Sequence, residues 1–143
     1  MNESDFPAPV EGFVLAHTLI VSDVKASCEW YTKMLDGKMV LETDARGTPC
    51  IIKVANSWII LNIGGGEPTD DKPETTVSVK HDQDVLSIFL NIRVADIQDF
   101  YRTRKERGAK FITEPKEHKS EFRCYMTDPD GYLIEVGESK ARD

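Results

Sequence analysis

One acidic residue lies in an apolar segment, where a charge is unfavourable without a partner. Glu135 lies in the middle of an otherwise apolar run, Leu133 to Val136. A carboxylate is costly to bury without a partner, so a cation should lie beside it. Two kinds of cation remain open: a bound metal ion, or an ion pair with Arg93 or Arg123, which strand alternation places on the same face. Glu135 is therefore a candidate metal ligand, catalytic base or ion-pair partner.

The same alternation predicts which polar side chains accompany Glu135. Asn91 lies two residues before Arg93 in one strand-like run, and Tyr125 lies two residues after Arg123 in another, so each pair shares a face. Asn62, from an earlier strand, is added to them. The residues predicted to line the ligand-binding face are Asn62, Asn91, Arg93, Arg123, Tyr125 and Glu135. Such a polar face of mixed charge suits a small ligand with an anionic group, which arginine binds as a fork-shaped partner. An internal network of ion pairs is the alternative.

His17 is the only histidine inside an apolar, strand-like segment. In a regular strand Ala16, Thr18 and Ile20 share one face, so His17 points the other way and packs under the following helix. A β-bulge could return it to the polar face. His17 is therefore either a core residue that packs under the helix or a ligand-binding residue on the polar face.

The remaining histidines and the cysteines form no recognisable site. His81 and His118 lie in polar segments, where we expect surface positions. Cys28, Cys50 and Cys124 are odd in number and widely spaced, which fits neither a disulfide framework nor a zinc site. We expect reduced thiols and a cytoplasmic location.

Composition limits the partners of the chain. Its 143 residues are 40% hydrophobic and 30% charged, which predicts one globular domain, residues 1–143. The 18 Lys and Arg against 25 Asp and Glu leave a net charge of −7, so phosphate backbones and anionic membranes are repelled. No apolar run approaches the roughly 20 residues of a membrane helix. We expect neither nucleic acid nor a membrane as partner, and a short loose arm at the N-terminus.

Two helices are predicted, each with an aspartate cap before it and a glycine after it. The first runs from about Lys25 to Leu35 between Asp23 and Gly37, with Gly37 in a left-handed conformation. The second follows Asp96 and runs to about Arg107, where Gly108 ends it.

The predicted strands surround these helices in a repeated order. They cover residues 13–21, 38–43, 49–55, 58–63, 86–94, 111–112, 121–127 and 132–136. Val21-Ser22-Asp23 corresponds to Val94-Ala95-Asp96, and Asn62-Ile63-Gly64 to Glu135-Val136-Gly137, at one constant offset. The sequence thus predicts an α+β fold of two β-α-β-β-β modules, residues 13–63 and 86–137, joined by a connector at 64–85.

At this point the chain resembles the vicinal oxygen chelate superfamily, which includes glyoxalases, extradiol dioxygenases and the fosfomycin and bleomycin resistance proteins. The matching motifs are Val21-Ser22-Asp23, Trp30-Tyr31 before Leu35-Asp36-Gly37, and the closing Asp128-Pro129-Asp130-Gly131 followed by residues 132–136. The resemblance implies two modules that curl into an open cup, a small-molecule ligand and a homodimer. In the family's enzymes a divalent metal at the base of the cup binds adjacent substrate oxygens.

The resemblance also locates the family's metal ligands. They fall on Ala16 or His17, Asn62, Phe89 and Glu135, which leaves His17 and Glu135 as the candidate metal residues. Two histidines and a carboxylate are not available, so extradiol dioxygenase chemistry is excluded. We expect a metal-free binding protein of the bleomycin-resistance type, with at most a weakly bound divalent metal. The alternative is a metal-dependent glyoxalase-like lyase or isomerase with Glu135 as ligand or base.

Overall fold

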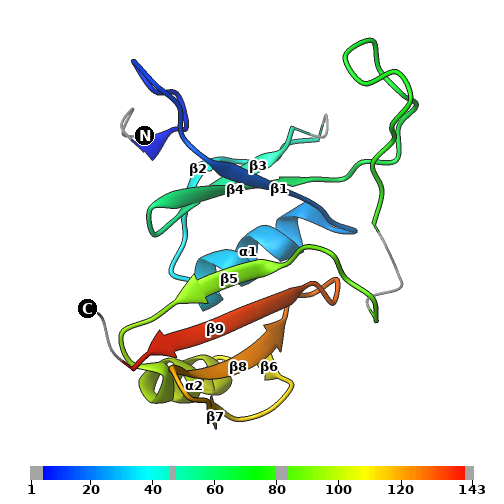
Figure 1. Cartoon of the computed structure of the whole chain (residues 1–143). Coiled ribbons are helices and arrows are strands. Elements are labelled where there is room, and N and C mark those ends of the chain that lie inside the picture. Colours follow the sequence, from blue (N-terminus) through cyan, green and yellow to red (C-terminus); the bar gives the residue numbers. More distant parts are fainter. Residues whose placement is uncertain (1–4, 46–47, 80–83, 141–143) are drawn as a thin grey trace. The chain divides into compact units, whose positions relative to one another are not determined.

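Two sheets and two helices make up the part of the chain that the structure, a computed structural model, describes: residues 5–45, 48–79 and 84–140 (Figure 1). The chain divides into two compact units, residues 1–80 and 81–143, and each is described by itself. In the described ranges, neither helix has the length and apolar character that crossing a membrane requires. The expected α+β fold class is confirmed.

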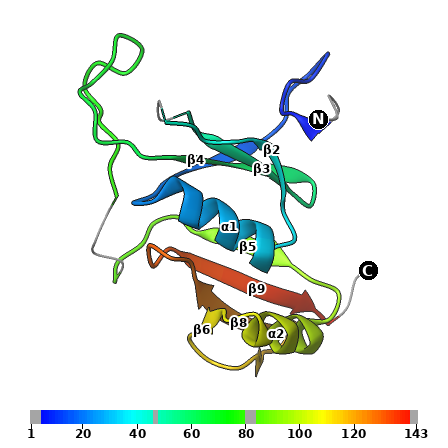
Figure 2. The same ribbon diagram turned by 180° about the vertical axis from the view of Figure 1, so that it is seen from behind.

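The first unit is a four-stranded sheet with one helix. Its elements are β1 (Ala16–Ile20), α1 (Val24–Met34), β2 (Lys38–Leu41), β3 (Cys50–Val54) and β4 (Ser57–Asn62). The strand order is β1-β4-β3-β2, with β1 parallel to β4 and the other pairs antiparallel. Helix α1 covers one face of this sheet (Figure 2), where it buries Cys28, Tyr31 and Met34.

The opposite face of the first sheet carries a smaller apolar cluster. Val40, Ile51 and Trp58 form it, and Phe6 from the N-terminal segment packs against it. The segment ahead of β1 was expected to be a loose arm, but its first described residues are bound to the sheet. Beyond them the backbone leaves the sheet before it returns as β1 (Figure 1), and residues 8–15 are exposed.

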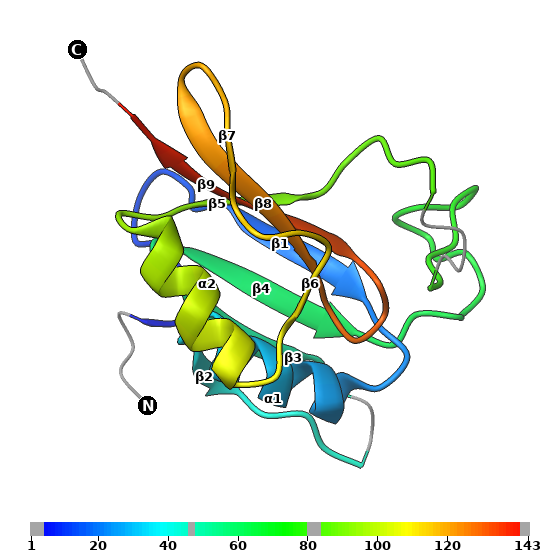
Figure 3. The ribbon, with the colours of Figure 1, turned by 90° about the horizontal axis from the view of Figure 1, so that it is seen from below.

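The second unit repeats this arrangement with one addition. Its elements are β5 (Leu90–Arg93), α2 (Ile97–Glu106), β6 (Lys110–Phe111), β7 (Lys116–Glu117), β8 (Glu121–Thr127) and β9 (Leu133–Ser139). The order is β5-β9-β8-β6, with β5 parallel to β9, and the short β7 pairs with β8 (Figure 3). The strand β7 was not predicted from the sequence.

Both predicted aspartate caps are present. The carboxylate of Asp23 accepts a hydrogen bond from the Ala26 amide at 3.0 Å, and that of Asp96 accepts one from the Asp99 amide at 3.1 Å. Each satisfies an amide that has no partner within its helix.

The two predicted glycine caps differ in outcome. Gly108 has φ +100° and ends α2 in the left-handed region, as expected. The prediction for Gly37 was wrong, because the left-handed residue after α1 is Asp36, with φ +53°. Gly37 is needed for another reason: a Cβ there would collide with the side chain of Ile52.

Candidate functional site

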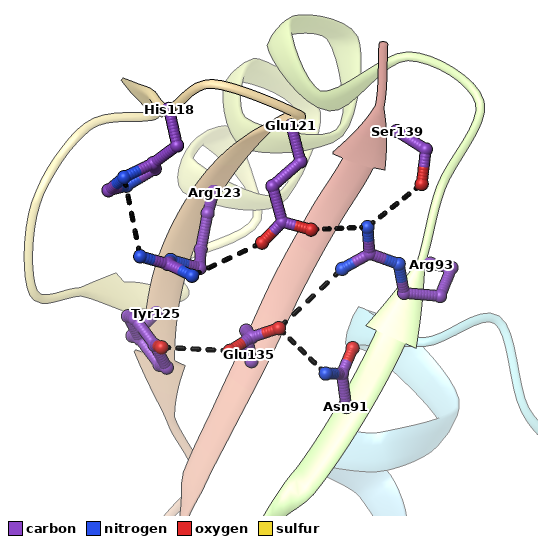
Figure 4. A network of polar contacts seen from close by, with 8 residues as sticks. All are labelled: Asn91, Arg93, His118, Glu121, Arg123, Tyr125, Glu135 and Ser139. Atoms are coloured by element: carbon purple, nitrogen blue, oxygen red, sulfur yellow. Dashed lines mark hydrogen bonds and ion pairs between the residues drawn. The ribbon is translucent and has the colours of Figure 1, made fainter. Parts of the chain in front are cut away.

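Glu135 lies at the centre of β9 with only 7% of its surface exposed. Its register partners are Asn91 on β5 and Tyr125 on β8, one on each side. The Tyr125 hydroxyl donates to Oε1 at 2.8 Å, and the Asn91 amide donates to Oε2 at 2.6 Å (Figure 4). The Arg93 Nη1 atom lies 3.5 Å from Oε2. Both carboxylate oxygens therefore have donors from neighbouring strands.

Two arginines extend this network along the same face (Figure 4). Arg93 Nη2 donates to Glu121 Oε2 at 2.6 Å and to the Ser139 hydroxyl at 3.0 Å. Arg123 Nη1 donates to the other oxygen of Glu121 at 3.3 Å, and its Nη2 donates to His118 Nδ1 at 3.3 Å. Glu121 thus holds both guanidinium groups from its two oxygens.

Gly137 makes room for this arrangement. In the strand register it is the partner of both Arg93 on β5 and Arg123 on β8. The Arg93 guanidinium lies over it so closely that a Cβ at position 137 would overlap the guanidinium atoms. A side chain at Gly137 would occupy the space through which Arg93 reaches the two glutamates.

The cations are the more accessible members of the network. The side chains of Arg93 and Arg123 are 43% and 34% exposed, whereas those of Glu121 and Glu135 are 18% and 10% exposed. These partly exposed guanidinium groups each carry five N–H donors, more than the contacts described above use, and arginine binds carboxylate or phosphate oxygens through such donors.

The pKa values of two groups reflect these contacts. The hydrogen bond from Arg93 lowers the pKa of Glu121 below its usual value and outweighs the opposing effect of burial. Burial raises the pKa of Tyr125, and its hydrogen bond to Glu135 raises it further. At neutral pH Glu121 is ionised, and Tyr125 keeps the proton that it donates to Glu135.

The structure brings five of the predicted site residues together: Asn91, Arg93, Arg123, Tyr125 and Glu135. Asn62 belongs to the first unit, where its side-chain oxygen accepts the amide of Ile63 at 2.9 Å. The other five residues all belong to the second unit.

His17 lies on the face of the first sheet that α1 covers. It pairs in register with Ile59, which pairs with Ile52 on β3. Ile52 packs beside Gly37 at the end of α1, and the adjacent Ala16 packs on the other face against the Trp58 cluster. His17 therefore has the orientation expected of a regular strand without a bulge.

The described donor set does not fit a metal centre with three protein ligands. Within residues 5–45, 48–79 and 84–140, no three His, Cys, Asp or Glu side chains are grouped so that they could hold an ion. Both oxygens of Glu135 already accept protein hydrogen bonds, and His17 points toward α1. His81 lies outside the described residues.

Four contributors to the face were missed: Gly137, Ser139, Glu121 and His118. The first three continue the alternation that identified Arg123, Tyr125 and Glu135: Glu121 lies two residues before Arg123, and Gly137 and Ser139 lie two and four residues after Glu135. His118 was expected at the surface, where it is, but its contact with Arg123 depends on the turn between β7 and β8.

Comparisons with known proteins agree with this fold. Residues 14–136 match the Glyoxalase/Bleomycin resistance protein/Dioxygenase superfamily. The metallothiol transferase FosB of Staphylococcus epidermidis is 27% identical over 124 residues, which are 86% of this chain and 79% of that protein.

Two solved structures share the fold at low sequence identity. The fosfomycin resistance protein FosX of Listeria monocytogenes superposes with a TM-score of 0.64 at 14% identity, over 92% of this chain and 96% of that one. TnmS3, an antibiotic binding protein of Streptomyces sp. CB03234, has a TM-score of 0.64 at 17% identity, over 93% and 100%. The fold therefore accommodates both a resistance protein and a binding protein, and the side chains must decide the function.

Proposed function

Because the chain belongs to the Glyoxalase/Bleomycin resistance protein/Dioxygenase superfamily, we propose that it binds a small anionic molecule on the face formed by β5, β9 and β8. The observation that carries the proposal is the pair of guanidinium groups on Arg93 and Arg123. They are the accessible members of a network whose carboxylates lie deeper. A carboxylate, phosphate or phosphonate group is the matching ligand chemistry.

The other residues of the face position the two arginines. Glu121 holds both guanidinium groups, and Glu135 holds the second nitrogen of Arg93. Asn91 and Tyr125 keep the Glu135 carboxylate in place by donating to its two oxygens. Since these contacts exist before a ligand arrives, little side-chain ordering is needed on binding, which favours affinity.

A direct test measures binding of two phosphonates by isothermal titration calorimetry. Fosfomycin and methylphosphonate are titrated into the full chain and into Arg93→Met and Arg123→Met. The control is Arg102→Met, which removes an exposed arginine whose ion pairs are with Asp99 and Glu106 on α2. We expect each substitution on the face to weaken binding at least tenfold, and the control to change it less than twofold. Equal affinity in all four proteins, or no binding of either compound by the unaltered chain, contradicts the proposal.

A divalent-metal-dependent lyase or isomerase is the second candidate. It is favoured by Glu135, which lies on the last strand and is hydrogen-bonded to a protonated phenol. We expect little metal on the purified protein, because few ligands are available. Elemental analysis for Zn, Ni, Mn and Fe after dialysis distinguishes the two candidates. Metal near one equivalent, lost in Glu135→Gln, supports the enzyme and contradicts the metal-free proposal.

A further inference from the structure

The first sheet places two lysines side by side on the face opposite α1. Lys38 on β2 and Lys53 on β3 are direct register partners. Like charges at such positions repel one another, so an anion between them relieves the repulsion. The Lys53 ammonium also lies 5.4 Å from the centre of the Trp58 ring, within the range of a cation–π contact. This part of the first sheet combines two cations with an aromatic surface.

Asp5 supplies the anion. Its carboxylate lies 2.6 Å from Lys38 Nζ and 3.3 Å from Lys53 Nζ. Its backbone oxygen accepts the Trp58 indole N–H at 2.7 Å. The next residue, Phe6, packs on the apolar cluster that contains Trp58. The hydrogen bonds from Lys38 and then Lys53 hold the pKa of Asp5 below its usual value. Asp5 and Phe6 together thus present an anion joined to an aromatic group.

The described part of the N-terminal segment contacts the sheet mainly through Asp5 and Phe6. From Ala8 to Leu15 the chain is exposed, with Phe13 at 90% of its maximal exposure. At Leu15 the described chain is again bonded to the sheet, because the Leu15 carbonyl accepts the Ser57 hydroxyl at 2.8 Å. A segment whose described contacts with the sheet come mainly from Asp5 and Phe6 can leave without disturbing the strands beneath it, because those strands keep their own hydrogen bonds.

We propose that Lys38, Lys53 and Trp58 form a second binding site, for an anion carried on an aromatic or aliphatic body, and that Asp5 and Phe6 occupy it as a built-in competitor. A ligand of this chemistry reproduces the four contacts of the segment: two charge-assisted bonds, an acceptor for the indole N–H and an apolar group on the cluster. The site lies within the first unit, whereas the face that carries Arg93 and Arg123, the arginine face, lies within the second.

The test uses 8-anilinonaphthalene-1-sulfonate, which joins an anion to an aromatic body, and follows its fluorescence with the full chain. Asp5→Asn removes the competing charge and keeps the shape of the side chain. The matched control is Asp71→Asn, which loses the same charge in the exposed 64–79 segment. We expect Asp5→Asn to bind the probe at least fivefold more tightly than the unaltered chain, and Asp71→Asn to match the unaltered chain.

A second variant separates a true site from mere loosening of the fold. Adding Lys53→Met to Asp5→Asn should return the affinity to that of the unaltered chain, with circular dichroism unchanged. The indole N–H resonance of Trp58, one of only two in the chain, should also move when the probe is added. The proposal is wrong if Asp5→Asn and Asp71→Asn bind the probe equally, or if Lys53→Met leaves the tight binding intact. The arginine face is unchanged in every variant, so failure here leaves the proposed function standing.

Discussion

Glu135 illustrates how a charge is kept inside an apolar strand. The sequence argument left a metal ion and an arginine as alternative partners for it. In the structure Arg93 is only one of three donors, and it is the most distant, at 3.5 Å. The closer donors, Asn91 and Tyr125, were predicted on the same face but not as direct partners. Alternation identifies a shared face, but which side chains touch depends on register, which the sequence does not specify by itself.

Replacing Glu135 tests its role in holding the network. Glu135→Gln keeps the shape but loses a charge that matches Arg93, and its amide cannot accept from all three donors. We expect a loss of about 1–3 kcal/mol in the free energy of unfolding, measured by urea denaturation. Tyr125→Phe removes one hydrogen bond and should cost about 0.5–1.5 kcal/mol. A Glu135→Gln variant as stable as the unaltered chain would show that these contacts do not stabilise the fold.

Glu121 gives the second prediction at this scale, in the pH dependence of stability. Its pKa in the folded state is lowered from 4.5, so its contribution is complete above that value and is lost as the pH falls through the lowered pKa. Thermal melts should therefore show a lower Tm for Glu121→Gln at pH 7, and the difference should close in acid. The exposed Glu106→Gln on α2 should show little difference at either pH. A gap that persists in acid contradicts this assignment.

At the scale of elements, the N-terminal caps of the helices were predicted better than the C-terminal caps. A serine or aspartate before an apolar period determines an N-cap locally, which is why Asp23 and Asp96 were identified. The error at Gly37 has a tertiary cause. This glycine is needed because a Cβ would collide with Ile52, and not because of its backbone angle. The strand β7 is two charged residues that pair with β8, and a segment so short carries no periodic pattern.

Gly137 offers a test of how β9 positions an arginine on β5. Gly137→Ala should displace the Arg93 guanidinium from Glu121 and Glu135, because the added Cβ overlaps it. In an Arg93→Met background the same change meets no guanidinium, so its cost should fall. The two substitutions should therefore be coupled by about 0.5 kcal/mol or more in a double-mutant cycle of urea melts. Additive effects would mean that Arg93 does not occupy the space above Gly137.

At the scale of the whole molecule, the repeat predicted the two units. The offset between the two modules placed a strand, a capped helix and three strands in each, and the structure contains both sets. The predicted first strands were too long, because residues 13–15, Ile88 and Phe89 are apolar but exposed, and they lie outside the strands of the described chain. Apolar character alone could not distinguish the residues of a buried strand from the exposed apolar residues that precede it.

These exposed residues lead to a prediction about assembly. Phe13 and Leu15 precede β1, and Ile88 and Phe89 precede β5. Exposed apolar side chains therefore lie just before each of these two edge strands. Exposed apolar patches of this kind favour association, and most soluble oligomers are symmetric dimers. We expect light scattering at micromolar concentration to give about 32 kDa, twice the 16.1 kDa of one chain. A mass of one chain at that concentration contradicts the expected homodimer.

The central claim, that the arginine face of the second sheet binds a small anion, is tested most directly by locating a bound anion. Methylphosphonate, which has almost no apolar body, is titrated into ¹⁵N-labelled protein while amide resonances are followed. We predict saturable shifts concentrated at Arg93, Arg123 and Gly137, the three positions that meet across β5, β8 and β9. These shifts should vanish in the Arg93→Met/Arg123→Met double variant. Shifts centred elsewhere, or shifts at this face that survive the double substitution, would contradict the account.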